Sequence, residues 1–224
     1  MQAEPTPTDA NAHFAVLLSG EVTVTERLKS QVEGTRVIAA DSGMRHAAAL
    51  RVKPELWVGD FDSADAHLID SWPDVRREPY PPAKNATDGE IAIETAIDSG
   101  ARRIILVGAL GGERTDHAFA HMALAVKLAE RGFEITLTSG EEEGFPLTGT
   151  PMTFDLPKGS LFSLLAFADI ASLTIEGARY PLTDFDCTFG TTRTISNVAE
   201  GPVTIRHAGG PALLLARPND FSGA

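Results

Sequence analysis

The sequence predicts an α/β protein in which a largely parallel N-terminal domain precedes an antiparallel, β-rich C-terminal domain. Up to about residue 140, short apolar runs alternate with helical patterns. Strands joined by helices of this length need crossover connections, so they pair in parallel, with both faces of the sheet covered. Beyond Ser139 the apolar runs are short and turn residues separate them, which is typical of an antiparallel sandwich or barrel. We therefore expect two domains, residues 12–140 and 147–219.

In the N-terminal domain, each expected strand is an apolar run followed by Gly, Asp or Ser. The expected strands cover residues 14–18, 36–40, 56–58, 103–107 and 133–138. The expected helices cover residues 24–32, 44–50, 64–71, 88–99 and 115–131. Ligands of parallel sheets bind outside the carboxyl ends of the strands. Asp41, Asp60 and the glycine-rich run after Val107 all fall at that edge, so it is where we expect function.

The C-terminal domain is introduced by a charged stretch. Residues 141–146 combine three glutamates with Gly144 and Pro146, and we interpret them as a linker. The expected strands after it cover residues 152–156, 161–167, 172–175, 203–207 and 212–216.

Composition and charge narrow the classes of function. The chain has 224 residues, and 19 basic against 31 acidic residues give a net charge of −12, which disfavours nucleic acid and anionic membranes as partners. No apolar run approaches the roughly 18 residues of a membrane span. The single cysteine, Cys187, excludes an internal disulfide framework, and residues 1–11 lack the apolar core of a secretory signal. We expect a cytoplasmic protein.

The most informative run is Trp57-Val58-Gly59-Asp60-Phe61-Asp62-Ser63, which ends a buried strand with two carboxylates. In extended backbone, Asp60 and Asp62 point to the same face. Two carboxylates held this close repel unless a cation lies between them, and Mg²⁺ prefers oxygen ligands. The alternative is a polar loop in which each aspartate caps a turn.

Asp41-Ser42-Gly43 lies between an expected strand and an expected helix. Small residues and free N–H groups at a helix start would let an anion approach the backbone. The alternative is an ordinary turn in which Asp41 or Ser42 caps the helix.

Thr87-Asp88-Gly89-Glu90 begins the expected helix 88–99. Thr87 and Glu90 fit a capping box, and Asp88 would be stabilised by the helix dipole. The functional alternative makes Asp88 a third carboxylate beside Asp60. Lys84 could bind a phosphate or could simply be solvated.

The run Gly108-Ala109-Leu110-Gly111-Gly112-Glu113-Arg114-Thr115-Asp116-His117 leads from a strand through a glycine-rich turn into a helix. Backbone N–H groups of such a loop can bind phosphate oxygens, and the fork of Arg114 suits phosphate. The alternative makes Thr115 the N-cap, Asp116 a residue stabilised by the helix dipole, and His117 a packed or surface histidine.

In this order and spacing, the motifs resemble those of the thiamine pyrophosphokinase family over most of residues 14–217. The resemblance rests on Ala-Asp-Ser-Gly at 40–43, Gly-Asp-Phe-Asp-Ser at 59–63, Lys84 with Thr-Asp at 87–88, Arg-Thr-Asp-His at 114–117, Gly-Ala-Arg-Tyr-Pro-Leu at 177–182 and Ser-Asn at 196–197. One motif alone is weak, whereas the ordered set is highly specific. The family usually has Asp-Gly-Gly where this chain has Asp41-Ser42-Gly43, and its glycine pair abuts the arginine, whereas Glu113 intervenes here.

The resemblance implies transfer of the pyrophosphoryl group of ATP to the hydroxyl of thiamine, giving thiamine diphosphate and AMP. It implies an α/β domain that binds nucleotide and metal, a β-sandwich domain that binds thiamine, and a homodimer. The implied catalytic set is Asp60, Asp62, Asp88 and Asp116, of which the first three would bind Mg²⁺. The nucleotide phosphates, or the groups that orient them, would be handled by Asp41, Ser42, Gly43, Lys84, Thr87, Arg114 and His117. Ser196 and Asn197 would lie beside thiamine.

The implied reaction is a direct displacement at the β-phosphorus of ATP, in which positioning and charge neutralisation dominate. Asp41 and Asp116 are both candidates for a general base. Two other functions stay open: a pyrophosphokinase or metal phosphohydrolase acting on another alcohol, and a non-catalytic nucleotide or thiamine sensor.

Overall fold

The computed structural model describes residues 12–61, 66–80 and 86–223, which form two compact units. The first unit combines the chain up to Ser19 with Glu26–Leu106. The second combines Gly20–Thr25 with the chain from Val107 onward. Asp62, Ser63 and Lys84 lie outside the described residues. Among the helices of the described ranges, none is both long and apolar enough to cross a membrane.

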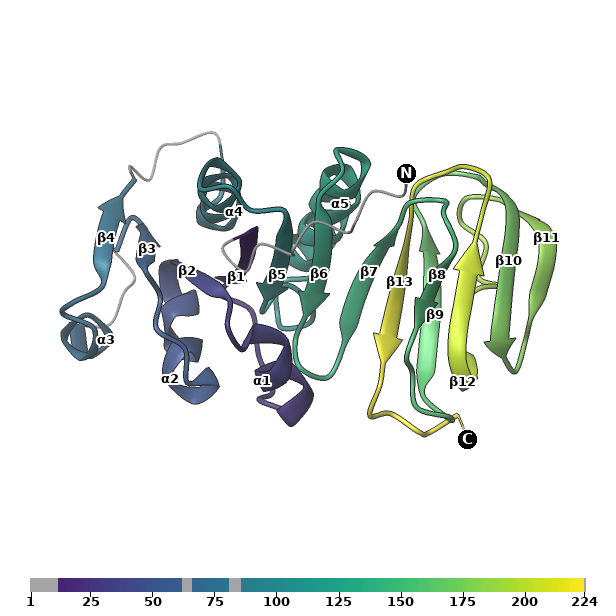
Figure 1. Ribbon diagram of the computed structural model, residues 1–224, viewed down its shortest axis with the longest axis horizontal. Coiled ribbons are helices and arrows are strands. Elements are labelled where there is room, and N and C mark those ends of the chain that lie inside the picture. Colours follow the sequence, from purple (N-terminus) through teal and green to yellow (C-terminus); the bar gives the residue numbers. More distant parts are fainter. Residues whose placement is uncertain (1–11, 62–65, 81–85, 224) are drawn as a thin grey trace, which may run out of the picture. The chain divides into compact units, whose positions relative to one another are not determined.

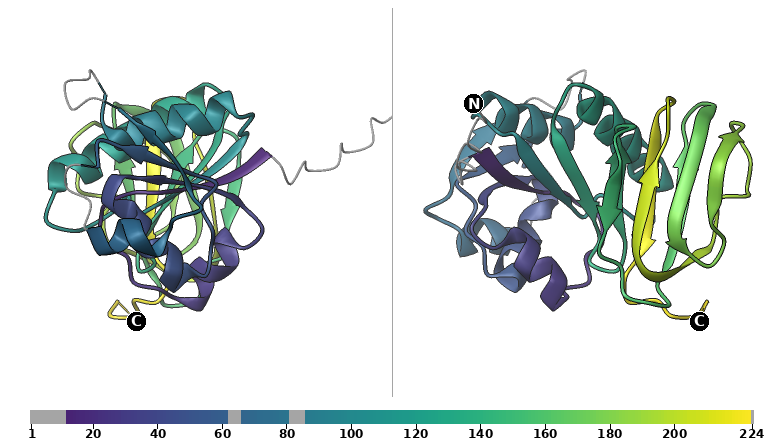
Figure 2. Two further views of the ribbon diagram at one scale, coloured as in Figure 1. Left: turned by 90° about the vertical axis from the view of Figure 1, so that its left-hand side faces the viewer. Right: turned by 45° about the vertical axis from the view of Figure 1, so that its right-hand side comes forward.

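The first unit is an α/β layer structure, as the sequence predicts (Figures 1 and 2). Its strands are β1 (His13–Leu17), β2 (Arg36–Ala40), β3 (Leu56–Gly59), β4 (Arg76–Pro79) and β5 (Arg103–Val107), in the spatial order β5-β1-β2-β3-β4. The pairs β1–β2, β2–β3 and β3–β4 are all parallel. The helical segments are α1 (Glu26–Val32), the 3-10 helix η2 (Asp41–Arg45), α2 (His46–Leu50), α3 (Ala66–Ser71) and α4 (Asp88–Asp98). Figure 1 shows α4 on one face of this sheet and α1 and α2 on the other.

Burial on both faces explains why the strand predictions in this unit succeed. In β1, β2 and β5 every residue after the first is buried. Such strands appear in the sequence as short continuous apolar runs. β4 is the exception, because it lies at the edge of the sheet and its residues are mostly exposed. The sequence Arg-Arg-Glu-Pro therefore carries no apolar pattern, and the strand was not foreseen.

The second unit contains one long helix and an antiparallel β-structure. The helix is α5 (Thr115–Glu130), which packs on β6, β7 and β13. The strands are β6 (Glu134–Thr138), β7 (Glu143–Leu147), β8 (Met152–Phe154), β9 (Leu161–Ala166), β10 (Ile170–Ala178), β11 (Leu182–Cys187), β12 (Asn197–Arg206) and β13 (Ala212–Arg217). Their order is β11-β10-β12-β9-β13-β7-β6, with β8 paired to β12.

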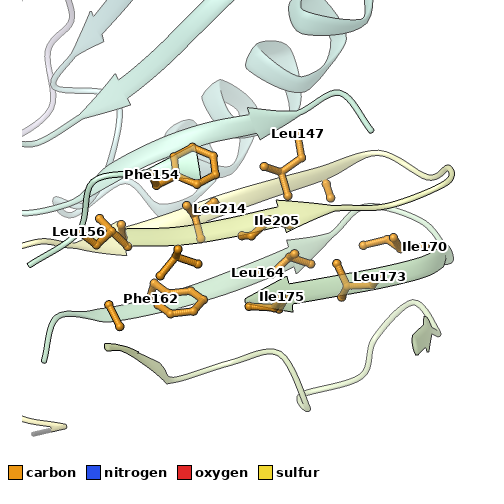
Figure 3. Packing of buried hydrophobic residues seen from close by; sticks show 14 of the residues in the cluster. Leu147, Phe154, Leu156, Phe162, Leu164, Ile170, Leu173, Ile175, Ile205 and Leu214 are labelled. Carbon is orange, nitrogen blue, oxygen red and sulfur yellow. The ribbon is translucent and has the colours of Figure 1, made fainter. Parts of the chain in front are cut away.

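The long strand β12 joins the two sheets of the sandwich. Its first residues, Asn197 and Val198, pair with β9. Its later part pairs with β10 on one side and β8 on the other. Between the sheets lies a core that includes Phe154, Phe162 and Leu164, shown in Figure 3. The β-sandwich expected from the family resemblance is therefore confirmed.

The interpretation of residues 141–146 as a linker is wrong, because Glu143–Leu147 forms the strand β7. β7 pairs with β13 along its whole length but with β6 only at Glu143 and Gly144. Pro146 lies beyond the pairing with β6, so its missing N–H interrupts no second ladder. Glu143 is buried, with 2% of its surface exposed, which a charged linker would not predict.

A short segment, Gly20–Thr25, belongs to the second unit although its sequence neighbours belong to the first. The Thr23 N–H donates to the carbonyl of Ser139 at 2.8 Å, and the Thr25 hydroxyl donates to the carbonyl of Gly140 at 3.4 Å. Gly20 lies so close to Gly108 that a Cβ on Gly20 would come within 2.2 Å of the Gly108 carbonyl oxygen. Only a residue without a side chain fits there.

Candidate active site

Two of the expected site residues follow neighbouring strands of the first unit. Asp41 follows β2, and Asp60 follows β3. The strands are parallel, with Ala40 opposite Val58, so both aspartates leave the same edge of the sheet. Gly59 makes the approach possible, because a Cβ there would come within 3.2 Å of the Asp41 Cα. The side chains of Asp41 and Asp60 are half-buried.

The conformation at this edge is fixed by Trp57, for which the sequence predicts only a place in a buried strand. Trp57 is fully buried, and its indole N–H donates to the Asp41 carbonyl at 2.8 Å. Its ring also meets Phe61 edge-on, with centroids 5.1 Å apart. Asp41 and Phe61 both have positive φ, 45° and 60°. Positive φ is uncommon outside glycine, above all for a bulky residue, and clusters at sites where surrounding structure enforces it.

Ser42 and Gly43 lie in η2, whose N-cap is Ala40 with no capping side chain. Neither Asp41 nor Ser42 therefore acts as the N-cap that the alternative interpretation assigned. Gly43 is buried, and a Cβ on it would come within 2.3 Å of the Leu17 carbonyl oxygen. The small residue at this position therefore allows η2 to lie against β1.

The third expected metal ligand, Asp88, is the first residue of α4 and is half-buried. Thr87 is the N-cap, and its hydroxyl accepts the Glu90 N–H at 3.2 Å, which confirms that half of the predicted capping box. Within the described ranges, no three His, Cys, Asp or Glu side chains gather closely enough to hold a metal. Because Asp62 is outside those ranges, the set Asp60, Asp62 and Asp88 stays a prediction.

In the second unit, the glycine-rich loop between β5 and α5 has glycines with positive φ and a largely exposed backbone. Gly108, Gly111 and Gly112 have φ values of 78°, 70° and 81°, which favour glycine. The Gly108 N–H donates to the carbonyl of Thr138 at 2.8 Å, which fixes the start of the loop. Residues from Gly111 to His117 are exposed. The loop therefore presents backbone to solvent just before the helix begins.

At the end of this loop, Arg114 and Asp116 form a two-pronged ion pair. The Arg114 Nε donates to one carboxylate oxygen of Asp116 at 2.9 Å, and Nη2 donates to the other at 2.7 Å. The Arg114 guanidinium holds the pKa of the Asp116 carboxyl well below its usual range, with a further contribution from the backbone N–H of His117. Both side chains are about two-thirds exposed, so the pair orients Arg114 more than it stabilises the fold. Arg114 occupies the N-cap position of α5, and Thr115 is the first helical residue instead of the N-cap.

The two residues expected beside thiamine lie at the start of β12 and differ in environment. Ser196 is exposed and has a φ of 59°, and its N–H donates to the Ser163 hydroxyl at 3.0 Å. Asn197 is buried; its amide oxygen accepts the N–H groups of Tyr180 and Val198, and its amide nitrogen donates to the Tyr180 carbonyl. Asn197 therefore fixes the backbone of Tyr180, whose side chain is 62% exposed.

Comparison with known proteins gives consistent matches over most of the chain. The protein-family model described as "Thiamin pyrophosphokinase, catalytic domain" matches residues 29–137. A second family model, "Thiamin pyrophosphokinase, vitamin B1 binding domain", matches residues 146–210. A curated relative, thiamine pyrophosphokinase of Bacillus subtilis (strain 168), is 30% identical over 178 residues, covering 74% of this chain and 78% of that protein.

Solved structures share the fold. A thiamine pyrophosphokinase structure from Bacillus subtilis has a TM-score of 0.80 at 21% identity, covering 93% of this chain and 100% of that one. One from Geobacillus thermodenitrificans has a TM-score of 0.76 at 27% identity, covering 95% and 99%. A more distant one from Candida albicans has a TM-score of 0.75 at 13% identity, covering 97% and 96%.

Proposed function

This chain belongs to the thiamine pyrophosphokinase family, a family of thiamine diphosphokinases, and from that premise we propose that it converts thiamine and ATP into thiamine diphosphate and AMP. The observation that carries the proposal is the pair of matches in sequence order, to the catalytic domain and to the vitamin B1 binding domain. A kinase for an unrelated alcohol would have no reason to match the second. The same pair disfavours a metal phosphohydrolase that acts on another substrate.

We assign the metal to the carboxylates of the first unit. Asp60 and Asp88 are half-buried side chains that offer oxygen ligands, the type that Mg²⁺ takes. With Asp62 they would hold Mg²⁺, which when bound would offset negative charge on the phosphate oxygens. Asp41 lies next to Asp60 at the same sheet edge, and its backbone is fixed by Trp57. It is therefore suited to orient a ligand there.

The nucleotide phosphates are assigned to the loop and ion pair of the second unit. For Ser42, Gly43, Lys84 and Thr87 of the first unit, a role toward the nucleotide remains what the family resemblance implies. Arg114 keeps N–H groups beyond the two that Asp116 accepts, and a guanidinium binds phosphate oxygens through paired hydrogen bonds. Asp116 remains ionised and orients Arg114. The reaction asks for little covalent chemistry from the protein, so these groups act by binding and by neutralising charge.

Thiamine is assigned to the start of β12. The N–H of Ser196 is held by the Ser163 hydroxyl, and its side chain is exposed. Ser196 is therefore a better candidate than the buried Asn197 for direct contact with thiamine. Asn197 would act beside thiamine by fixing the Tyr180 backbone. A homodimer and a cytoplasmic location complete the proposal, and sedimentation velocity of the purified protein tests the first.

The proposal is tested by product analysis with ATP, thiamine and Mg²⁺. We expect AMP and thiamine diphosphate in equal amounts, and no product after the metal is removed with EDTA. Asp60→Asn should lower turnover by about one to three orders of magnitude at saturating Mg²⁺ and thiamine. Asp74→Asn, an exposed aspartate of the same unit, is the matched control and should behave as wild type.

Other outcomes would decide against the proposal. Release of ADP or inorganic phosphate would indicate a different transfer or a hydrolase. Binding of both substrates without AMP formation would favour a sensor. Full activity of Asp60→Asn would remove Asp60 from the chemistry.

A further inference from the structure

His121 lies on α5, one helical turn after His117, and its imidazole reaches back to the start of the glycine-rich loop. The distance from its Nδ1 to the Ala109 carbonyl oxygen is 3.2 Å. A carbonyl oxygen can only accept, so Nδ1 must carry the proton in this contact. The side chain is half-buried, and burial lowers the pKa of His121, while the hydrogen bond to Ala109 acts in the opposite direction and the nearby His117 lowers the pKa further. The contact with Ala109 therefore fixes the proton on Nδ1.

The carbonyl that accepts from His121 belongs to Ala109, near the start of the glycine-rich loop. Ala109 is 2% exposed, and its N–H lies 3.4 Å from the Thr138 carbonyl, which also accepts the Gly108 N–H. The strand end therefore restrains the N–H side of Ala109, and His121 restrains its carbonyl side. Beyond Ala109 the chain passes through Gly111 and Gly112, both with positive φ, before it reaches Arg114.

Glycine-rich backbone loses much conformational entropy when it is ordered, so the restraint at Ala109 matters for everything that follows it. His121 connects the first part of the loop to the helix that the loop enters. A restraint at Ala109 would limit the positions that the backbone N–H groups of Gly111 and Gly112 can take relative to Arg114, which occupies the N-cap of α5.

We propose that His121 is a positioning residue for ATP: by donating to Ala109 it holds the loop 108–112 in the conformation that binds phosphate. The inference rests on the proposed function, in which the phosphates of ATP bind this loop and Arg114. It adds a residue outside the Arg-Thr-Asp-His motif, acting through the backbone and not by contact with substrate.

The test compares two substitutions in the full-length enzyme. His121→Phe keeps a planar ring and loses the donor, whereas His121→Gln keeps an N–H donor. Because loss of one hydrogen bond corresponds to about a tenfold change, we expect His121→Phe to raise KM for ATP about tenfold while KM for thiamine changes less than about twofold. His121→Gln should restore most of the ATP affinity. Lys127→Ala, an exposed position on the same helix, is the matched control and should leave both KM values unchanged.

Several results would overturn the inference. Unchanged KM for ATP in His121→Phe would do so, as would equal losses for ATP and thiamine that His121→Gln does not repair, which would indicate a purely structural role. If His121→Phe does not fold, the ¹⁵N chemical shifts of His121 in the wild-type protein decide: a proton on Nε2 with a bare Nδ1 would exclude the bond to Ala109. Failure of the proposed function is distinct, because the wild type itself would then form no thiamine diphosphate.

Discussion

Replacing Trp57 by phenylalanine should weaken both the stability of the first unit and the use of ATP. Trp57 is fully buried, and its N–H donates to the Asp41 carbonyl at 2.8 Å. Phenylalanine keeps an aromatic ring but removes that donor and part of the buried volume. The Asp41 carbonyl then loses a partner in a half-buried place, at a residue whose φ is already positive.

The magnitude follows from the two losses. Leaving a partly buried acceptor without its donor costs about 1–3 kcal/mol, and the smaller ring adds about 1 kcal/mol for the space it leaves. We therefore expect the free energy of unfolding to fall by about 2–4 kcal/mol. Since Asp41 is assigned to the nucleotide side of the site, kcat/KM for ATP should fall about tenfold, the equivalent of one hydrogen bond.

Urea unfolding followed by circular dichroism measures the first effect, because the substitution removes a fluorophore and fluorescence would not be comparable. Steady-state kinetics measures the second. Trp72→Phe is the matched control, since Trp72 is the other tryptophan of the chain. Trp72 is half-buried and lies in the same unit, in the connection that follows α3 and precedes β4 in the sequence. If the two variants have the same stability and the same kcat/KM for ATP, the role assigned to the Trp57–Asp41 bond is wrong.

Three further predictions concern the second unit. Arg114→Lys replaces a planar fork by a single ammonium, so kcat/KM for ATP should fall tenfold or more, by about 1.4 kcal/mol or above, in steady-state assays; unchanged ATP kinetics would count against the assignment of Arg114. The Arg114 guanidinium lowers the pKa of Asp116, so the pair is intact above the ordinary carboxyl pKa and is lost only as pH falls through the lower folded-state value. A ¹³C NMR titration should therefore find the pKa of Asp116 below the ordinary carboxyl value in the wild type. In Arg114→Lys the pKa of Asp116 should lie closer to that ordinary value. Burial raises the pKa of the Cys187 thiol, which is 1% exposed, so a thiol reagent should label the folded protein only as fast as the chain unfolds; rapid labelling without denaturant would contradict that burial.

The sequence predicted those parts of the fold whose physical cause is local. Strands buried on both faces are continuous apolar runs, so β1, β2, β3 and β5 were found nearly to the residue. β4 and β7 were not, because an exposed edge strand and a strand with a buried glutamate and a proline carry no such run. Their identity as strands depends on neighbours that are distant in sequence, Arg76–Pro79 on β3 and Glu143–Leu147 on β13.

The candidate site divides in the same way. Asp41 and Asp60 could be assigned to one sheet edge from strand direction alone. The support that Trp57 gives to Asp41 could not be foreseen, because it requires that β2 and β3 be adjacent. No role for His121 could be predicted from the sequence, because its partner is a backbone carbonyl that the sequence does not mark.

The segment Gly20–Thr25 means that no single cut in the gene separates the two units. A fragment that starts at Val107 would leave the carbonyls of Ser139 and Gly140 without the donors that Thr23 and Thr25 supply. During synthesis these threonines are made well before their acceptors. The segment Gly20–Thr25 can form these hydrogen bonds only after residues more than a hundred positions later have been made. Adding a synthetic peptide of this sequence to the shortened fragment is one way to restore its folding.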